Sequence, residues 1–119
     1  ERLGLTLEHR LAHVERLYRA GVTLVSGADS GISPGKPHGT LPESVIELGA
    51  CGVPTDVALT SATSLAATAC RIADRTGRLH AGLDADLLIV DGDPMADITA
   101  LRDVRTVVFR GRDVLPGVD

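Results

Sequence analysis

One carboxylate in this sequence stands where metal or proton chemistry could be performed. Asp29 follows the short apolar run 22–26 by three residues and has a glycine two positions away on either side. A carboxylate in such a position can ligate a divalent metal ion and accept a proton from metal-bound water. An aspartate at the start of a loop also commonly forms an Asx-turn with its own backbone. The local sequence leaves both interpretations open.

Histidines are the other side chains with catalytic potential. His38 lies late in the same loop, where a histidine could bind substrate near a metal or be an exposed turn residue. His9 and His13 share one helix face, a spacing that holds zinc in H-E-x-x-H motifs. Arg10 stands where that motif has its glutamate and no third ligand is apparent, so a solvated helix face is favoured. His80 has no evident partner.

The glycine-rich loop around Asp29 fits neither of two common catalytic loops. The stretch from Gly31 to Gly35 is one residue too short for G-x-x-x-x-G-K-[ST], and Pro37 replaces the final Ser or Thr. In the run 27–31, Asp29 occupies the nucleophile position of G-x-S-x-G. Neither a phosphate-binding loop nor a serine nucleophile is therefore predicted.

The elements that must position these residues follow from the apolar periodicity. Thr6 and Gly21 are the expected N-cap and C-terminal glycine of a helix whose apolar residues recur at helical spacing. The β-branched run 22–26 predicts a strand that is buried on both faces. The long loop 27–40 follows it, and long ordered loops in compact proteins tend to be functional.

Helices and then strands are expected after this loop. Helix starts are predicted at Pro42 (a helix through about Leu48), at Thr55 or Asp56, and at Thr60 or Ser61, the last helix running to about Ala73. Strands are expected at 87–91, 104–110 and 112–115, with a short turn over 97–101. The change from helices to strands near Arg75 suggests two segments.

The composition excludes several classes of protein. The 119 residues fit one domain, with 44% hydrophobic residues but one Phe, one Tyr and no Trp. The net charge of −4 and the lack of a Lys/Arg run argue against a nucleic-acid partner. No apolar run is long enough to span a membrane and no signal peptide is visible, so no membrane partner and a cytoplasmic location are expected. Cys51 and Cys70 are predicted to be buried, reduced thiols.

Neither half of the chain is expected to be self-sufficient. A doubly buried strand has no partner within residues 1–75, and a ribbon of two or three strands is marginal by itself. The unpaired strand edges and an apolar helix face predict self-association. Residue 1 is Glu and the only methionine is Met95, so either a short leader was removed or the chain is a fragment of a larger protein. The motifs favour the larger protein.

Read together, four stretches resemble the end of an amidohydrolase-superfamily enzyme, in the branch that holds imidazolonepropionase and the prolidase-like metallopeptidases. The segment 21–31 resembles the eighth barrel strand with its terminal aspartate, and His38-Gly39 with Glu43 and Glu47 resembles the helix that follows. The stretch 60–67 resembles the family's T-x-x-A helix, and 77–111 resembles its return into a small β-sandwich. The resemblance covers nearly the whole chain in the right order.

This resemblance implies an α/β fold: the C-terminal fragment of a (β/α)₈ barrel, with its last strand and following helices, plus strands of an accessory β-sandwich. Residues 1–75 would be the barrel portion and residues 76–119 the C-terminal strands of the composite sandwich. The family hydrolyses C–N bonds with one or two divalent metal ions, here expected to be zinc, in a small-molecule amide or peptide substrate. Asp29 would be the metal ligand that orients and deprotonates the attacking water, and His38 would bind substrate.

The sequence also departs from the family's pattern. It contains no His-x-His, the ligands of the middle barrel strands are absent, and Ala28 replaces the commoner Thr before Asp29. A whole barrel needs about 250 residues. The isolated chain is therefore expected to be inactive and to bind metal weakly. The alternative, from another class, is a non-catalytic binding or assembly module derived from such a fragment.

Overall fold

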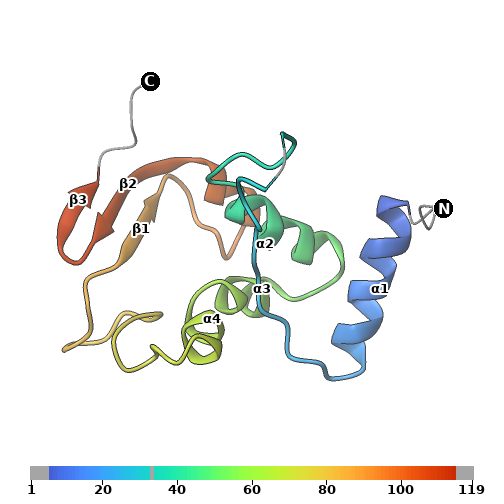
Figure 1. Ribbon diagram of the computed structural model, residues 1–119, viewed down its shortest axis with the longest axis horizontal. Coiled ribbons are helices and arrows are strands. Elements are labelled where there is room, and N and C mark those ends of the chain that lie inside the picture. Colours follow the sequence, from blue (N-terminus) through green and yellow to red (C-terminus); the bar gives the residue numbers. More distant parts are fainter. Residues whose placement is uncertain (1–5, 33, 115–119) are drawn as a thin grey trace.

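The computed structural model describes residues 6–32 and 34–114 (Figure 1). These residues form four α-helices, one 3₁₀-helix (η1) and a three-stranded antiparallel sheet. The bounds are Leu7–Arg19 (α1), Leu41–Ala50 (α2), Thr55–Ser61 (α3), Ser64–Ala69 (α4), Leu87–Val90 (β1), Ile98–Arg102 (η1), Val104–Phe109 (β2) and Arg112–Val114 (β3). The predicted α/β class is confirmed, with a sheet that is small and antiparallel.

Helix α1 begins and ends where its capping residues predict. The Thr6 side chain accepts a hydrogen bond from the backbone N–H of His9 at 3.3 Å, which satisfies one of the free donors of the first turn. Glu8 lies in that turn, where the helix dipole favours a negative charge. At the other end, Gly21 takes a positive φ of 80° and donates to the carbonyl of Tyr18.

The predicted strand over 22–26 is wrong for this chain. None of these residues lies in a strand, and the segment runs past α3 as an irregular chain (Figure 1). Val22 and Val25 are 45% and 46% exposed, so the expected burial on both faces is also wrong. The physical reason is that a parallel strand needs neighbours on its two edges, and the described residues supply none. Two backbone hydrogen bonds hold the ends of the segment: the Val22 N–H donates to the carbonyl of Leu17 at 3.1 Å, and the Ser26 N–H donates to the carbonyl of Ser61 at 3.0 Å.

The helices after the loop are close to the prediction, with shifted ends. Helix α2 has Pro42 in its first turn as expected, and α3 begins at Thr55 after Pro54, which takes the cap position without a side-chain hydrogen bond. The helix expected from Thr60 or Ser61 to Ala73 instead starts at Ser64 and ends at Ala69.

A left-handed residue explains the early end of α4. Arg71 has a φ of 59°, its N–H donates to the carbonyl of Thr68, and the N–H of Ile72 donates to the carbonyl of Ala67. This is the Schellman pattern, in which two carbonyls of the last turn are satisfied by the residues that leave the helix. Glycine usually occupies this position, so an arginine there gave no sequence signal.

One core joins the helices to the end of the chain. Val45 of α2, Cys51, Val53, Ala58 of α3 and Leu101 of η1 are buried together. Leu101 reaches this cluster from the second half of the sequence, so the helical half and the sheet half share a core. The predicted division between residues 75 and 76 stays a prediction.

The sheet is a meander in the order β1-β2-β3. Leu87 pairs with Val108 in the first antiparallel ladder. Arg110 and Gly111 both take positive φ, at 48° and 75°, as a two-residue type I′ hairpin between β2 and β3 requires. The Asp86 carboxylate accepts hydrogen bonds from the Arg110 N–H at 2.9 Å and from the Thr76 hydroxyl at 2.8 Å. This carboxylate ties the hairpin to the segment that follows α4.

Two glycines in this segment allow a matched test of close packing. Both have a positive φ, 96° at Gly77 and 92° at Gly82. A Cβ on Gly77 would lie 2.5 Å from the Ala67 Cβ, whereas a Cβ on Gly82 would meet nothing within 4 Å. We expect Gly82→Ala to cost roughly 1–2 kcal/mol of backbone strain. Gly77→Ala should cost about 1–3 kcal/mol more, because α4 must also move.

Urea unfolding of the two variants beside the wild-type chain measures this difference. Equal losses of unfolding free energy in the two variants would show that the chain at Gly77 does not pack closely on α4.

Candidate functional site

The candidate site is the loop 27–40, with Asp29 near its start. Asp29 has a φ of 49°, in the left-handed region that aspartate and asparagine adopt more readily than most residues. Its side chain is 67% exposed, and the Lys36 ammonium lies 3.6 Å from its Oδ2 atom. The carboxylate is thus held at the surface in a conformation that turns the chain sharply.

The chain before Asp29 is fixed by a pair of serines. Besides the backbone bond between Ser26 and Ser61, their hydroxyl oxygens are 2.6 Å apart. Ser61 is fully buried and donates its hydroxyl proton to the carbonyl of Ala58 at 2.6 Å, so Ser26 must be the donor in the hydroxyl pair. These contacts attach the start of the loop to α3. Ser61 was predicted only as a helix cap, and its role here had no signal in the sequence.

The loop closes on itself through two further hydrogen bonds. The Gly31 N–H donates to the carbonyl of Lys36 at 2.7 Å, and the Ser30 and Thr40 hydroxyls are 3.1 Å apart. His38 packs its imidazole against Gly31, where an added Cβ would lie 2.9 Å from the His38 Cε1 atom. Asp29, Lys36 and His38 therefore lie on one small loop. Asp29 and His38 had been predicted as site residues from the sequence, whereas Lys36 had not.

This loop can supply part of a metal site. An exposed aspartate oxygen is a suitable ligand for a divalent ion, and four ligands are usual for zinc. Across residues 6–32 and 34–114, no three side chains of His, Cys, Asp or Glu lie close enough together to hold an ion. The residues present could therefore supply one ligand, Asp29, to a metal coordination shell that needs further ligands.

The other residues considered from the sequence lie outside this loop. His9 accepts or donates a hydrogen bond with the Thr6 hydroxyl at 3.0 Å, and His13 lies 3.0 Å from the Arg16 guanidinium, both on the exposed surface of α1. The interpretation of these two histidines as a solvated helix face is confirmed. His80 is also exposed, with its Nδ1 atom 2.8 Å from the carbonyl oxygen of Ala81.

The two cysteines are free thiols in different surroundings. Cys51 is buried in the core, and this burial, assisted by Glu47 and Glu15, raises the pKa of its thiol. The predicted burial of Cys70 is wrong. Cys70 is exposed because α4 ends at it, and it lines an open apolar groove between that helix and the sheet.

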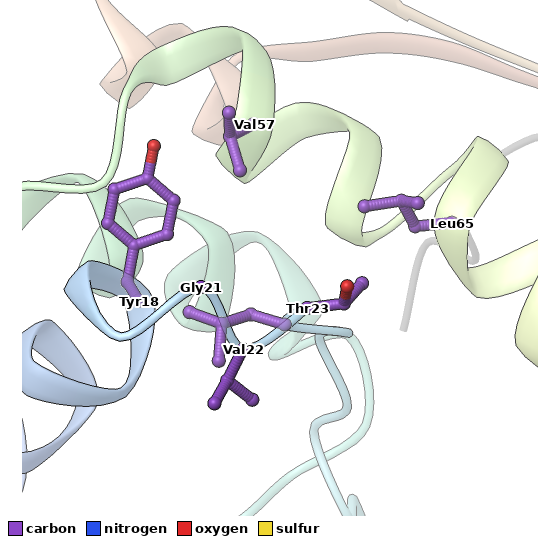
Figure 2. Close-up of a pocket in the computed structure, with 7 residues that line it drawn as sticks. Tyr18, Gly21, Val22, Thr23, Val57 and Leu65 are labelled. Atoms are coloured by element: carbon purple, nitrogen blue, oxygen red, sulfur yellow. The ribbon is translucent and has the colours of Figure 1, made fainter.

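A small apolar pocket lies beside the segment that leads to Asp29. Figure 2 shows Tyr18 from α1, Val57 from α3 and Leu65 from α4 around the residues Gly21 to Thr23. The pocket measures about 260 Å³, and none of the three residues Asp29, Lys36 and His38 lines it. It is therefore a packing gap around the segment 21–24 and not the place where the loop would act on a ligand.

The helix after the loop is fixed by an ion pair. The Arg102 guanidinium donates to both carboxylate oxygens of Glu43, at 2.8 and 2.6 Å. This hydrogen bonding, with a smaller contribution from the positive charge of Arg102, lowers the pKa of Glu43 below its ordinary value. The pair connects α2 to η1 and so sets the direction in which the loop enters α2.

No helix in the described ranges is both long and apolar enough to cross a membrane.

Comparisons with known proteins give a consistent family. The sequence model of the amidohydrolase family matches residues 3–114. A Xaa-Pro dipeptidase, solved with methionine in its active site, is 31% identical, with a TM-score of 0.82 over 90% of this chain and 26% of its own. A Bifidobacterium longum protein assigned as a prolidase is 27% identical, with a TM-score of 0.81 over 89% of this chain and 26% of its own.

A third solved structure, molinate hydrolase, is 27% identical, with a TM-score of 0.78 over 92% of this chain and 27% of its own. The chain thus spans about a quarter of the length of the structures that it matches. None of the curated proteins matches it.

The pair of Glu43 and Arg102 predicts a pH dependence of stability. Because the pKa of Glu43 is lower in the folded than in the unfolded chain, the ionised carboxylate stabilises the fold at neutral pH. That contribution is lost as the pH falls through the folded pKa. We expect Glu43→Gln to lower the unfolding free energy at pH 7, with a difference from wild type that shrinks below about pH 4.

Urea unfolding at a series of pH values measures this difference. Glu47→Gln, an exposed change on the same helix, serves as the control and should differ little from wild type at any of these pH values. A deficit of Glu43→Gln that is as large at pH 3 as at pH 7 would contradict the assignment.

Proposed function

This chain belongs to the amidohydrolase family, and we propose that it is the C-terminal part of a metal-dependent enzyme that hydrolyses C–N bonds in amides, cyclic amides or peptides. The observation that carries the proposal is the family match over residues 3–114, which includes the entire loop from Asp29 to His38. The isolated chain is proposed to be inactive, since it supplies one ligand of a site that needs several.

The open surface of the chain supports the proposal that it completes a barrel. Its accessible surface is 8779 Å², whereas a compact monomer of this mass exposes about 6,100 Å². Its radius of gyration is 15.5 Å, against roughly 13.5 Å for a compact domain of this length. We propose that in the intact protein, where further strands would flank it, the segment 22–26 forms the last strand of a (β/α)₈ barrel, and that the sheet belongs to an accessory β-sandwich.

In this proposal Asp29 is both ligand and base. A bound divalent ion, proposed to be zinc in one or two copies, supplies Lewis acidity and lowers the pKa of the attacking water. Asp29 would be one of the residues that hold this ion, and its carboxylate would accept a proton from the attacking water. His38, placed against Gly31 in the same loop, is proposed to contact the substrate.

The substrate class follows the relatives and is itself a proposal. The similar structures are a dipeptidase for Xaa-Pro dipeptides and a hydrolase of molinate. A small-molecule amide or peptide is therefore proposed as the substrate of the intact protein, which is proposed to be cytoplasmic.

A second candidate function is a non-catalytic binding or assembly module derived from such an enzyme. It is favoured by the fact that residues 6–32 and 34–114 hold no group of three potential ligands. The coding sequence upstream of Glu1 distinguishes the two candidates. A His-x-His after an apolar run supports the enzyme, and a start codon within a few residues of Glu1 supports the module.

Asp29→Asn tests the catalytic role in the intact protein. Asparagine keeps the shape of the side chain and tolerates the left-handed backbone, so the fold should persist. Loss of the base should reduce kcat by about 10²–10⁴-fold. Steady-state hydrolysis together with circular dichroism measures both effects. Asp113→Asn, an exposed change on β3, is the matched control, and full turnover by Asp29→Asn would remove Asp29 from the mechanism.

We also propose that the isolated chain self-associates through β1 and the apolar groove beside it. The groove measures about 930 Å³ and lies between α4 and the sheet. Leu88 and Ile89 of β1 line it and are 50% and 43% exposed, and β1 is an edge strand without a charged residue. Such an edge offers unpaired N–H and C=O groups to a second copy.

Leu88→Lys should weaken this association. A lysine on an edge strand opposes strand pairing, because its charge would be desolvated in the paired state. Light scattering over a range of concentrations should show a smaller average mass for Leu88→Lys than for wild type. Ile32→Lys places the same change at a 68% exposed position in the site loop and should leave the mass unchanged. A monomeric wild-type chain would contradict the proposal.

A further inference from the structure

The cation beside Asp29 differs from every other cation that forms an ion pair here. Lys36 is the only lysine of the sequence, which has 12 basic residues. In the described residues, four other ion pairs join an arginine to a carboxylate: Arg19–Glu15, Arg75–Asp84, Arg102–Glu43 and Arg105–Asp91. Their N–O distances are 2.6 to 2.8 Å, whereas the Lys36–Asp29 distance is 3.6 Å. The pair at the candidate site is therefore the loosest of the five.

The chemistry of lysine suits a pair that must open. Arginine binds a carboxylate with a rigid planar fork, while lysine carries a point charge on a flexible four-carbon stem. The side chain of Lys36 is 49% exposed and that of Asp29 is 67% exposed, so water competes with the contact. Asp29 can exchange this partner for another cation at little cost.

The backbone of Lys36 is fixed while its side chain remains movable. Its carbonyl accepts the 2.7 Å hydrogen bond from the Gly31 N–H, and the following residue, Pro37, disfavours a helical backbone at Lys36. Rotation of the stem therefore keeps the ammonium within a side-chain length of Asp29. Asp29 is the only acidic residue in the stretch 27–40, and Glu43 beyond it is already bound by Arg102. An ammonium that leaves Asp29 has no second carboxylate on this loop.

We propose that Lys36 is a specificity-determining residue that recognises a carboxylate of the substrate. It pairs with Asp29 until that side chain coordinates a divalent ion, and it is then free to bind a negative group on the molecule that enters. The proposal rests on the proposed function, because it places Lys36 at the site where Asp29 acts. It narrows the substrate class to amides or peptides that carry a free carboxylate near the bond to be cleaved.

Electrostatics supports both steps. With a divalent ion on Asp29, the local charge would change sign and the ammonium of Lys36 would be repelled from its partner. The same excess positive charge attracts an anionic substrate, and Lys36 adds a charge-assisted hydrogen bond to it. A substrate with a neutral end would gain neither contribution.

The first arm of the test uses the reactivity of the Lys36 amine. The full-length protein, with zinc bound and after zinc removal, is treated with an amine-reactive acetylating reagent, and mass spectrometry follows the peptide that contains Lys36. We expect zinc to accelerate acetylation of Lys36 by about two- to fivefold, the range that an exposed ion pair can suppress. In Asp29→Asn, which has no ion pair to release, the rate should be the same with and without zinc.

The second arm measures specificity in the full-length protein with alanyl-proline and its C-terminal amide. Lys36→Met removes the charge and keeps the length of the side chain, and Lys36→Arg keeps the charge. We expect Lys36→Met to lower kcat/KM for the free acid by roughly ten- to hundredfold, mainly through KM, and to leave the amide unaffected. Lys36→Arg should retain most of the preference for the acid.

The outcomes separate this proposal from the function on which it rests. An unchanged preference for the acid in Lys36→Met, or acetylation of Lys36 that does not respond to zinc, overturns the role of Lys36 and leaves the hydrolase intact. A protein that cleaves neither compound counts against the proposed function, while the acetylation rate still decides whether Lys36 leaves Asp29 on metal binding.

Discussion

The position of the candidate site depends on how the segment 22–26 satisfies its backbone. An apolar, β-branched run is suited to a parallel sheet, where both edges receive hydrogen bonds from neighbours. The described chain offers no such neighbour, and Ser61 provides the contact instead, through its carbonyl and its hydroxyl. Ser61 can do so because it is fully buried at the end of α3, where its hydroxyl is already oriented by the carbonyl of Ala58. The loop that carries Asp29 begins directly after this anchor, and Asp29 follows Ser26 by three residues.

The second constraint is the return of the chain to its first half. Leu101 packs with Val45 and Ala58, and the adjacent Arg102 holds Glu43, so a short 3₁₀-helix contributes to the core and also fixes the start of α2. The loop 27–40 is thereby held at both ends, by Ser61 before it and by α2 after it. The sheet, in contrast, is attached mainly through Asp86 and η1 and leaves one apolar face uncovered.

The features that were predicted correctly from the sequence are those that depend on local interactions. The Thr6 cap, Pro42 in the first turn of α2 and the hairpin at Gly111 depend on interactions within a few residues, and all were found. The strand over 22–26 and the burial of Cys70 depend on partners far away in the sequence, and both predictions were wrong. Asp29 and His38 were predicted from their loop and the resemblance to amidohydrolases. Lys36 was missed because its interest lies in its distance to Asp29 in the fold, which the spacing of the two residues in the sequence does not give.

The geometry of each of two ion pairs suits the part of the fold in which the pair lies. Arg102 and Glu43 form two short hydrogen bonds between elements that must not move, and a planar guanidinium is suited to that task. Asp29 has to exchange its partner for a metal ion if the proposed chemistry is right, and a firm arginine contact would compete with the ion for the same oxygens. A lysine at 3.6 Å places a positive charge beside the carboxylate and still yields it readily, because both side chains are exposed. A lysine at position 36 is therefore consistent with the proposal that its ammonium leaves Asp29 when that carboxylate takes another partner.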